Sequence, residues 1–374
     1  MHLLPKTIDI FCRVIDNFGD IGVCWRLAQS LPSEPTIRLW VDDLISFNKI
    51  EPALGPNLCR QKLNGIEINH WHKQITEWQA ADLVIEAFAC DLPDAYLQAM
   101  KGHTQCWLNL DYLSAEKWVE AFHRQPSIQA NGVPKYFFFP GFTEKTGGLL
   151  RQHKLIHNEQ EKHSFLKTLL PADAYAFYQH NKPVLINLFC YAHAPIDALL
   201  SALPKDKAVM IVLADTVAPQ LETLAKKLNS TVYIQRLNFI VQSDYDCLLQ
   251  AADINLVRGE DSFVQAHWAE KPMLWHIYPQ DEAHHLLKLN AWLETISAPT
   301  WLRNLNNLWN QLGHTQSEAK QGKEFIALFA NYAFDTTGSA EWLSFQNSLY
   351  KQLDKQPSLS QQIVDFYEEC LKKS

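Results

Sequence analysis

The chain has 374 residues, of which 47% are hydrophobic and 20% are charged, as in ordinary globular proteins. This length favours two domains, because single hydrophobic cores rarely grow beyond about 250–300 residues. The formal net charge of −8 argues against binding of nucleic acid, whose phosphates normally select basic proteins, and suits a protein partner with a basic patch.

The eight cysteines form no Cys-x-x-Cys pair, and most of them lie in apolar segments. We therefore expect buried free thiols in a reducing cytosol, and neither disulfides nor a zinc site. The acidic residues Asp9 and Asp16 come too early for a signal peptide, and no hydrophobic run is long enough to span a membrane. The sequence thus predicts a cytoplasmic protein without a membrane segment.

The first half of the chain alternates short apolar runs with helical patterns. Such alternation is typical of a doubly wound parallel sheet, whose strands are buried on both faces. We identify no hairpin signal in this half, so we expect no antiparallel pairing. Strands are predicted over residues 8–14, 36–41, 66–71, 83–87 and 106–110, and helices over residues 23–31 and 115–122.

The second half repeats this architecture and continues into helices beyond residue 300. The polar, glycine-containing stretch 143–162 is the expected domain junction, although it could also be a mobile loop within one domain. Strands are predicted over residues 184–189, 208–214, 231–236, 254–257 and 273–277, and helices over residues 219–228, 245–251, 325–332, 342–353 and 363–371.

The stretch from 254 to 289 combines two strand ends with two helix starts. A helix is expected to begin at Ser262, and the unpaired N–H groups of its first turn favour an anion. Arg258 adds a planar set of donors that suits phosphate, and Gly259 allows a ligand to approach the backbone closely. Since ligands of open α/β sheets bind at the carboxyl ends of strands, this stretch predicts a site for a diphosphate.

A simpler interpretation of the same stretch needs no ligand. Ser262 could be only a helix cap, and Glu260 and Asp261 could only complement the helix dipole. The loop matches neither GxxxxGK[ST] nor GxGxxG, so the P-loop and Rossmann fingerprints are both absent.

The order of small-residue loop, serine, helix, strand, Pro-x-Asp and helix resembles the donor half of GT-B glycosyltransferases. The runs VRGEDSF and WHIYPQ, together with DNFGDIGVCWRLA near the N-terminus, resemble more specifically the elongation factor P arginine rhamnosyltransferases, the EarP family. The similarity spans the whole chain. It implies an α/β protein of the GT-B fold, in which two Rossmann-like domains face each other across a cleft.

The resemblance also implies how the chain is divided and what it does. Residues 1–155 would form the acceptor domain, residues 156–355 the donor domain, and residues 356–374 a helix that packs back on the first domain. The reaction would be a single inverting transfer of L-rhamnose from dTDP-β-L-rhamnose to an arginine in the N-terminal domain of elongation factor P. This modification would activate the factor for relief of ribosome stalling.

Asp16 and Asp20 lie on the loop that leaves the first predicted strand. On a helical turn, their four-residue spacing would point both carboxylates the same way. Alternatively, Asp20 caps the helix and Asp16-Asn17 forms a turn. A protonated arginine is not a nucleophile, but a carboxylate can take its proton during attack and stabilise the resulting cation. By resemblance, Asp20 would be the general base, and Asp16 and Asn17 would position the guanidinium or the sugar.

The remaining assignments near the reacting groups also rest on the resemblance. Glu260 is essential in the family's motif, where it could hold sugar hydroxyls or orient the acceptor arginine. Phe18 and Gly19 would contact the donor together with Asn17. Asp111 and Tyr112 would join Asp16 and Asn17 in binding the acceptor.

Aromatic and polar residues of the second half could hold the nucleotide. Tyr191 ends a strand, so its hydroxyl could reach a phosphate or simply pack in the core. Phe239 and Tyr245 could stack on a pyrimidine while Gln242 reads its edge. Preference for thymine over uracil is implied by the resemblance alone.

The run Asp244-Tyr245-Asp246 matches a metal-binding DxD pattern. However, we expect Ser243 or Asp244 to cap a helix there, next to the donor. Arg258 and helix N–H groups can neutralise a leaving diphosphate without Mg²⁺, so no metal or other cofactor is expected.

Two other functions compete with this interpretation. The chain could be a GT-B enzyme that acts on a small molecule or a cell-wall precursor, or a nucleotide-sugar-binding module without catalysis. The presence of Asp20 and Glu260 argues against the module, because binding alone needs no base.

Overall fold

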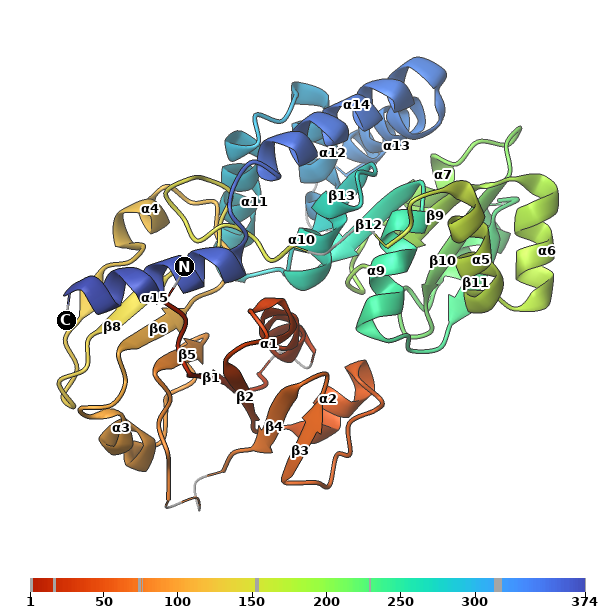
Figure 1. Cartoon of the computed structure of the whole chain (residues 1–374). Helices are drawn as coiled ribbons and strands as arrows, with labels where there is room; N and C mark the ends of the chain where they lie inside the picture. Colours follow the sequence, from red (N-terminus) through yellow and green to blue (C-terminus); the bar gives the residue numbers. More distant parts are fainter. Residues whose placement is uncertain are drawn as a thin grey trace. The chain divides into compact units, whose positions relative to one another are not determined.

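A computed structural model describes residues 3–15, 18–72, 75, 77–151, 155–228, 230–312 and 318–373. The chain divides into two compact units, each with its own sheet (Figure 1). The first unit comprises Met1–Arg151 and Gln356–Ser374, and the second comprises Gln152–Lys355. The chain therefore leaves the first unit once and returns to it for its last helix.

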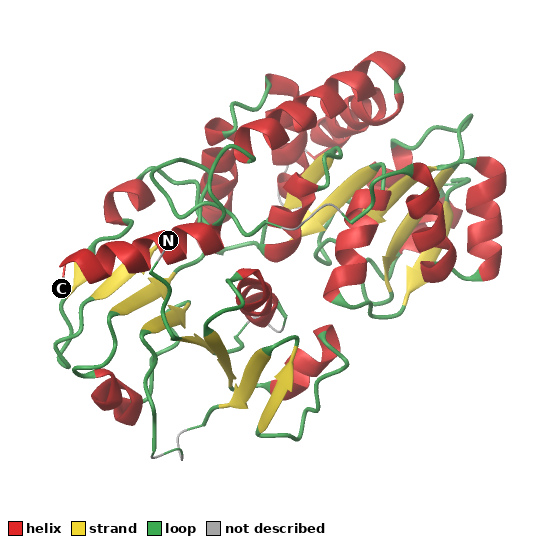
Figure 2. Cartoon of the chain, in the orientation of Figure 1, coloured by secondary structure: helices red, strands yellow, loops and turns green. Residues whose placement is uncertain are grey.

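The first unit is built on an eight-stranded sheet flanked by helices (Figure 2). The strand order is β3-β4-β2-β1-β5-β6-β8-β7, and all neighbours are parallel except the two edge pairs β3–β4 and β7–β8. The strands are β1 (Thr7–Cys12), β2 (Thr36–Val41), β3 (Arg60–Leu63), β4 (Ile66–His70), β5 (Leu83–Ala87), β6 (Cys106–Leu110), β7 (Pro126–Ser127) and β8 (Lys135–Phe138). The helices are α1 (Gly19–Ser30), α2 (Leu44–Ile50), α3 (Asp94–Met100), α4 (Trp118–Phe122) and α15 (Leu359–Lys373).

The expectation that this half contains no hairpin is wrong. Strands β3 and β4 form an antiparallel hairpin around Asn64 and Gly65, whose φ angles are 52° and 83°. An Asn-Gly pair is the strongest short hairpin signal, because both central residues of the favoured turn need positive φ. The signal was in the sequence, but the polar run RQKL before it did not resemble a strand.

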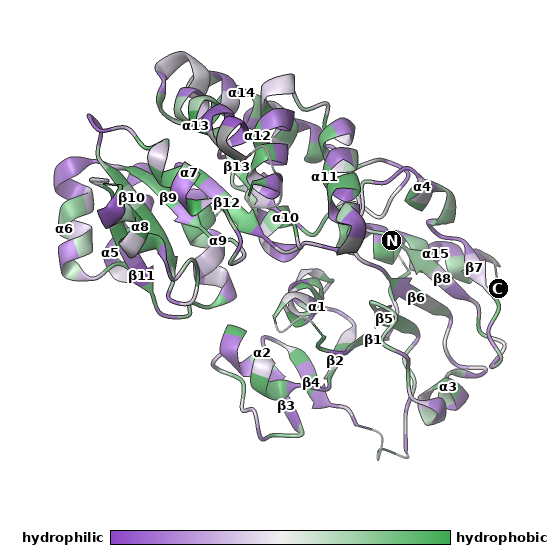
Figure 3. Cartoon of the chain, turned by 180° about the vertical axis from the view of Figure 1, so that it is seen from behind, coloured by the Kyte–Doolittle hydropathy of each residue, from purple (hydrophilic) through white to green (hydrophobic). Residues whose placement is uncertain are grey.

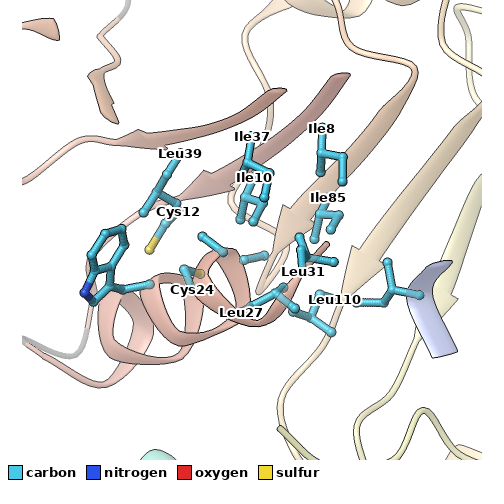
Figure 4. Packing of buried hydrophobic residues seen from close by; sticks show 14 of the residues in the cluster. Ile8, Ile10, Cys12, Cys24, Leu27, Leu31, Ile37, Leu39, Ile85 and Leu110 are labelled. Atoms are coloured by element: carbon cyan, nitrogen blue, oxygen red, sulfur yellow. The ribbon is translucent and has the colours of Figure 1, made fainter. Parts of the chain in front are cut away.

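One hydrophobic core joins α1 and α15 to the sheet of the first unit. Figure 4 shows Cys24 and Leu27 of α1, and Leu31 directly after this helix, on the side of β1 that carries Ile8 and Ile10. From the other end of the sequence, α15 lies along β6 and β8 (Figure 1) and adds its own apolar side chains to this core, namely Leu359, Ile363, Val364, Phe366, Tyr367 and Cys370. Each such buried side chain contributes roughly 1.5–3 kcal/mol relative to exposure, so α15 is an integral part of the first unit.

The second unit has an all-parallel sheet with the order β11-β10-β9-β12-β13. Its strands are mostly hydrophobic (Figure 3), as expected for a sheet covered on both faces. The strands are β9 (Val184–Leu188), β10 (Val209–Ala214), β11 (Tyr233–Leu237), β12 (Ile254–Arg258) and β13 (Met273–His276). The helices are α5 (Glu159–Leu169), α6 (Ala172–Asn181), α7 (Ile196–Ser201), α8 (Leu221–Lys227), α9 (Gln242–Ala251), α10 (Asp261–Trp268), a 3₁₀ turn η1 (Asp281–Ala283), α11 (His284–Thr295), α12 (Thr300–Gln311), α13 (Glu318–Phe334) and α14 (Thr336–Leu353).

All eight cysteines are free, and all except the exposed Cys59 and the half-buried Cys247 are buried. None of the helices formed by the described residues has both the length and the hydropathy that crossing a bilayer requires.

Candidate functional site

The carboxylate of Asp20 lies in the first turn of α1, just beyond the carboxyl end of β1. It is 2% exposed. One of its oxygens accepts the Ile15 backbone N–H at 2.9 Å, and the other accepts the Tyr112 hydroxyl at 3.4 Å. The cap position of α1 is Phe18, without a side-chain cap hydrogen bond, so the alternative that Asp20 only caps this helix is wrong. The carboxylate is instead fixed between the ends of two strands.

Of the residues predicted to act beside Asp20 on the same loop, the structure describes Phe18 and Gly19. Asp16 and Asn17 lie outside the described residues. Phe18 packs against the core of the first unit, 5.7 Å from the Lys49 ammonium, and Gly19 is the first residue of α1. The prediction that Phe18 and Gly19 contact a donor stays a prediction.

The end of β6 brings Asp111 and Tyr112 to the same edge of the sheet as Asp20. The Asp111 carboxylate is half-buried and accepts the Tyr112 backbone N–H at 2.8 Å. Tyr112 is 39% exposed, and its ring stacks on Phe88 with centroids 4.4 Å apart and planes 19° apart. Sequence reasoning did not identify Phe88, which immediately follows β5.

In the second unit, Arg258 is the last residue of β12. Its guanidinium packs over the rings of Phe189 and Tyr191, 4.4 and 4.8 Å from their centroids, and donates to the Cys190 carbonyl at 3.2 Å. The structure therefore brings together Arg258 and Tyr191, which were predicted separately. Burial raises the pKa of the Cys190 thiol to about 12, so this cysteine is a neutral neighbour of the arginine and not a nucleophile.

His276 holds the backbone of Tyr191 from β13, which lies on the other side of β12 from β9. It is fully buried at the end of β13, in register with Arg258, and its Nδ1 accepts the Tyr191 backbone N–H at 3.1 Å. The sequence suggested no contact of His276 with Tyr191, because only the parallel pairing of β12 and β13 places the histidine there. Arg258, Tyr191 and His276 thus form one cluster at the carboxyl edge of this sheet.

The loop between β12 and α10 has the backbone that the predicted anion site requires. Gly259 has a φ of 68°, and a Cβ there would meet nothing within 4 Å, so glycine is favoured for its left-handed conformation and not for lack of space. The Trp275 indole N–H donates to the Gly259 carbonyl at 3.1 Å and holds this turn. The backbone N–H groups of α10 begin directly beyond it.

Helix α10 begins at Asp261, with Glu260 at the cap position and no side-chain cap hydrogen bond. The alternative that Ser262 is the N-cap is therefore wrong. The Ser262 side chain instead hydrogen-bonds to the hydroxyl of Tyr245. Asp261 accepts from the Gln242 amide at 2.8 Å, so the starts of α9 and α10 are tied together.

The comparison with known proteins identifies the family of this chain. Residues 8–368 match the family model described as elongation factor P (EF-P) rhamnosyltransferase EarP. The chain belongs to the EarP family. The protein-arginine rhamnosyltransferases of Pseudomonas aeruginosa and Shewanella oneidensis are 44% and 39% identical to it over 324 and 346 residues. These matches cover 80% and 84% of this chain and 85% and 86% of the two relatives.

Solved structures agree with this assignment and define the fold. A structure described as the basis for EarP-mediated arginine glycosylation of EF-P is 26% identical, with a TM-score of 0.56 over 97% of this chain and 99% of the other. MurG from Acinetobacter baumannii, at 12% identity, has a TM-score of 0.51 over 97% of this chain and 99% of its own, which shows the fold alone. The chain is therefore a glycosyltransferase of the GT-B fold, as its sequence predicted.

For this member of the EarP family, two aromatic residues predicted to act together have different surroundings. Phe239 is 54% exposed, whereas Tyr245 packs against the core of the second unit. The Tyr245 hydroxyl accepts the Asn187 amide at 3.2 Å, and burial raises its pKa. Of the pair, only Phe239 offers an exposed ring on which a base could stack.

The expected cap at the start of α9 is also wrong. This helix begins at Gln242 with Val241 at the cap position, so neither Ser243 nor Asp244 caps it. Both are exposed in the first turn, while Asp246 is 3% exposed. The two carboxylates of the DxD pattern therefore differ in exposure. Among the described residues, no group of three or more His, Cys, Asp or Glu side chains is placed to hold a metal ion.

A separate pocket of about 390 Å³ opens in the second unit, beside Lys162 and Trp268. Lys162 is buried and pairs at 3.3 Å with Asp253, which precedes β12. This pocket therefore lies toward the amino end of the strand that carries Arg258 at its carboxyl end, and none of the described site residues lines it.

Proposed function

We propose that this chain transfers L-rhamnose from dTDP-β-L-rhamnose to an arginine side chain of EF-P in a single inverting step. The observation that carries the proposal is the match of residues 8–368 to the family of EF-P rhamnosyltransferases. The relatives named protein-arginine rhamnosyltransferase support arginine as the acceptor. Because EF-P acts in translation, the reaction belongs in the cytoplasm.

Asp20 supplies the base that an arginine nucleophile needs. A guanidinium nitrogen attacks the anomeric carbon of rhamnose, and the bond from that carbon to the diphosphate oxygen breaks with its electron pair leaving on dTDP. The nitrogen loses its proton to the Asp20 carboxylate, which then faces the delocalised cation of the product. The hydrogen bonds from Ile15 and Tyr112 support this role, because they fix the carboxylate before the acceptor arrives.

Arg258 and the start of α10 form the diphosphate site. Their donors match the negative charge that grows on dTDP as it leaves, and they do so without a metal ion. Tyr191 and Gly259 complete this site, and the exposed Phe239 ring stacks on the thymine base. The remaining predicted donor residues, which line the starts of α9 and α10, are Gln242, Ser243, Asp244, Tyr245, Asp261 and Ser262.

The acceptor binds the first unit, and the donor binds the second. The target arginine lies in the N-terminal domain of EF-P and meets Asp20 beside Asp111 and Tyr112. Asp16 and Asn17 position the guanidinium or the sugar. Glu260, at the cap of α10, holds sugar hydroxyls or orients the arginine.

The direct test is the intact mass of EF-P after incubation with this protein and dTDP-rhamnose. We expect EF-P to gain one rhamnosyl group, and EF-P with lysine in place of the target arginine to gain none. Release of dTDP without a mass gain on EF-P would indicate another acceptor, such as a small molecule or a cell-wall precursor. Binding of the donor without release of dTDP would indicate a non-catalytic module.

A further inference from the structure

The segment that follows β5 has an unusual backbone. Phe88, Ala89 and Asp91 have φ angles of 55°, 50° and 56°, although none of them is glycine. Residues with a Cβ rarely adopt this left-handed conformation, and clusters of such residues persist only where the surrounding structure fixes them.

Hydrogen bonds fix this segment to the adjoining strands of the first unit. The Phe88 N–H donates to the Leu110 carbonyl of β6 at 2.7 Å, and the Cys90 thiol donates to the Phe11 carbonyl of β1 at 3.6 Å. The Asp91 N–H donates to a carboxylate oxygen of Glu86 in β5 at 3.2 Å. The segment is therefore held at both ends and in its middle.

Glu86 is itself held rigidly. It is 1% exposed, and one of its oxygens accepts the Trp107 indole N–H at 3.1 Å and the Lys135 ammonium at 3.2 Å. A buried carboxylate with this many donors has little freedom to move. The left-handed segment is thus anchored to a carboxylate that is itself fixed by residues of three neighbouring strands, β5, β6 and β8.

The rigid segment presents the Phe88 ring to Tyr112, whose hydroxyl faces Asp20. The Phe88 and Tyr112 rings stack at 4.4 Å, and the Tyr112 hydroxyl lies 3.4 Å from the Asp20 carboxylate. We propose that Phe88 is a positioning residue, which holds Tyr112 in the orientation that fixes Asp20 for proton transfer. This inference rests on the proposed function, in which Asp20 is the base.

The physical reason is the mobility that Tyr112 would otherwise have. Its side chain is 39% exposed, so water would allow its ring to change rotamer if no neighbour restricted it. A flat stack on Phe88 restricts the ring, because tilting it would break the contact across the whole face. Because the restricted Tyr112 hydroxyl holds the Asp20 carboxylate, the base is already oriented for the guanidinium nitrogen before the acceptor binds.

The test measures single-turnover transfer to EF-P at saturating donor and acceptor. Phe88→Leu and Phe88→Gly should each lower the rate of transfer by roughly three- to tenfold, because that factor corresponds to the loss of one aromatic pair. Phe88→Gly also accepts the left-handed backbone, so a rate loss there reports the missing ring and not backbone strain. Phe88→Tyr should restore the rate, and the affinity for dTDP should stay unchanged in all three variants.

A double-mutant cycle with Tyr112→Phe shows whether Phe88 acts through the Tyr112 hydroxyl. In that background, Phe88→Leu should cause no further loss, because the hydroxyl that it positions is already gone. An equal loss in both backgrounds would overturn the proposal. The matched control is Phe177→Leu, which breaks a similar stack on Tyr233 in the second unit, at 4.3 Å and 25°, and should leave the rate unchanged.

A second readout does not depend on the reaction. In protein labelled with fluorotyrosine, the Tyr112 signal is the one that Tyr112→Phe removes, and Phe88→Leu should shift it by removing the ring current of Phe88. An unmoved signal would refute the positioning role even in an active enzyme. If the wild-type protein transferred no rhamnose to EF-P, the proposed function would fail, and the fluorine spectrum would still show whether the Phe88 ring stacks on Tyr112.

Discussion

The replacement of Asp20 by asparagine tests whether this residue acts as a base, because it leaves the described hydrogen bonds of the side chain in place. The carboxylate accepts two described hydrogen bonds, from the Ile15 N–H at 2.9 Å and from the Tyr112 hydroxyl at 3.4 Å. The asparagine oxygen can keep the first. Its amide can donate to the Tyr112 oxygen in place of the second, because a hydroxyl both donates and accepts. Asp20→Asn therefore keeps the shape of the side chain and both of these described partners, while it removes the ability to take a proton.

We expect Asp20→Asn to slow transfer by at least about 10²-fold, the low end for loss of a general base. Each factor of ten corresponds to about 1.4 kcal/mol of transition-state stabilisation, so the expected loss is about 2.7 kcal/mol or more. Asp20→Ala serves as the contrasting variant. It removes the acceptor of the Ile15 N–H, so it should also lower the free energy of unfolding by roughly 0.5–1.5 kcal/mol, the net contribution of one hydrogen bond.

The assay follows the intact mass of EF-P in single turnovers, with dTDP binding measured by calorimetry and stability by urea unfolding. Asp20→Asn should bind dTDP as the wild type does and unfold at nearly the same urea concentration. Transfer at the wild-type rate by this variant would refute the assignment of Asp20 as the base. Loss of dTDP binding would instead mean that Asp20 serves the donor.

Three further predictions address the donor, the acceptor and the stability of the chain. Arg258→Ala should weaken dTDP binding by roughly 1.5–3 kcal/mol, the value of a charge-assisted hydrogen bond. EDTA should leave transfer intact, and a loss of transfer on chelation that Mg²⁺ restores would contradict a metal-free diphosphate site. The folded N-terminal domain of EF-P should accept rhamnose faster than a linear peptide with the same arginine, because remote contacts must orient a flexible side chain; equal rates would exclude docking. His267, whose pKa burial lowers to about 4, binds its proton more readily in the unfolded state, so the free energy of unfolding should fall as the pH drops from about 6.5 towards 4, by up to about 3 kcal/mol. This fall should be smaller in His267→Gln, and an identical pH dependence of urea unfolding in the two proteins would contradict it.

Continuous apolar runs made the central strands predictable from the sequence. The predicted strands 36–41, 83–87 and 106–110 have the same bounds as β2, β5 and β6. Every residue of β5 and β6 is buried, so these two strands are mostly apolar, whereas β2 alternates buried residues with more exposed ones. The edge strands β3 and β7 were missed, since the runs RQKL and PS are polar and short. At an edge, pairing with one neighbour stabilises a strand whose own residues do not favour it.

Helix starts were harder to predict than strands, for a reason that also affects the site. Caps were expected at Ser262 and at Ser243 or Asp244, because these residue types favour such positions. The structure begins α10 and α9 earlier, with Glu260 and Val241 at the cap positions and no side-chain caps. The expected cap at Ser262 instead bonds to Tyr245, so tertiary contacts override the local preference.

The sequence can identify a reactive group but not the residues that orient it. Arg258 and Tyr191 were predicted as phosphate contacts from their places at strand ends, and Asp20 was predicted as the base by resemblance to the EarP family. Phe88 and His276 have no such pattern. Phe88 reaches Tyr112 because β5 and β6 are neighbours. His276 reaches Tyr191 because β12 pairs with β13 on one side and, on the other, with β9, the strand that precedes Tyr191. Residues of this kind act through pairings that span the fold, so the geometry of a glycosyltransferase site depends on side chains whose importance appears only once the sheet order is known.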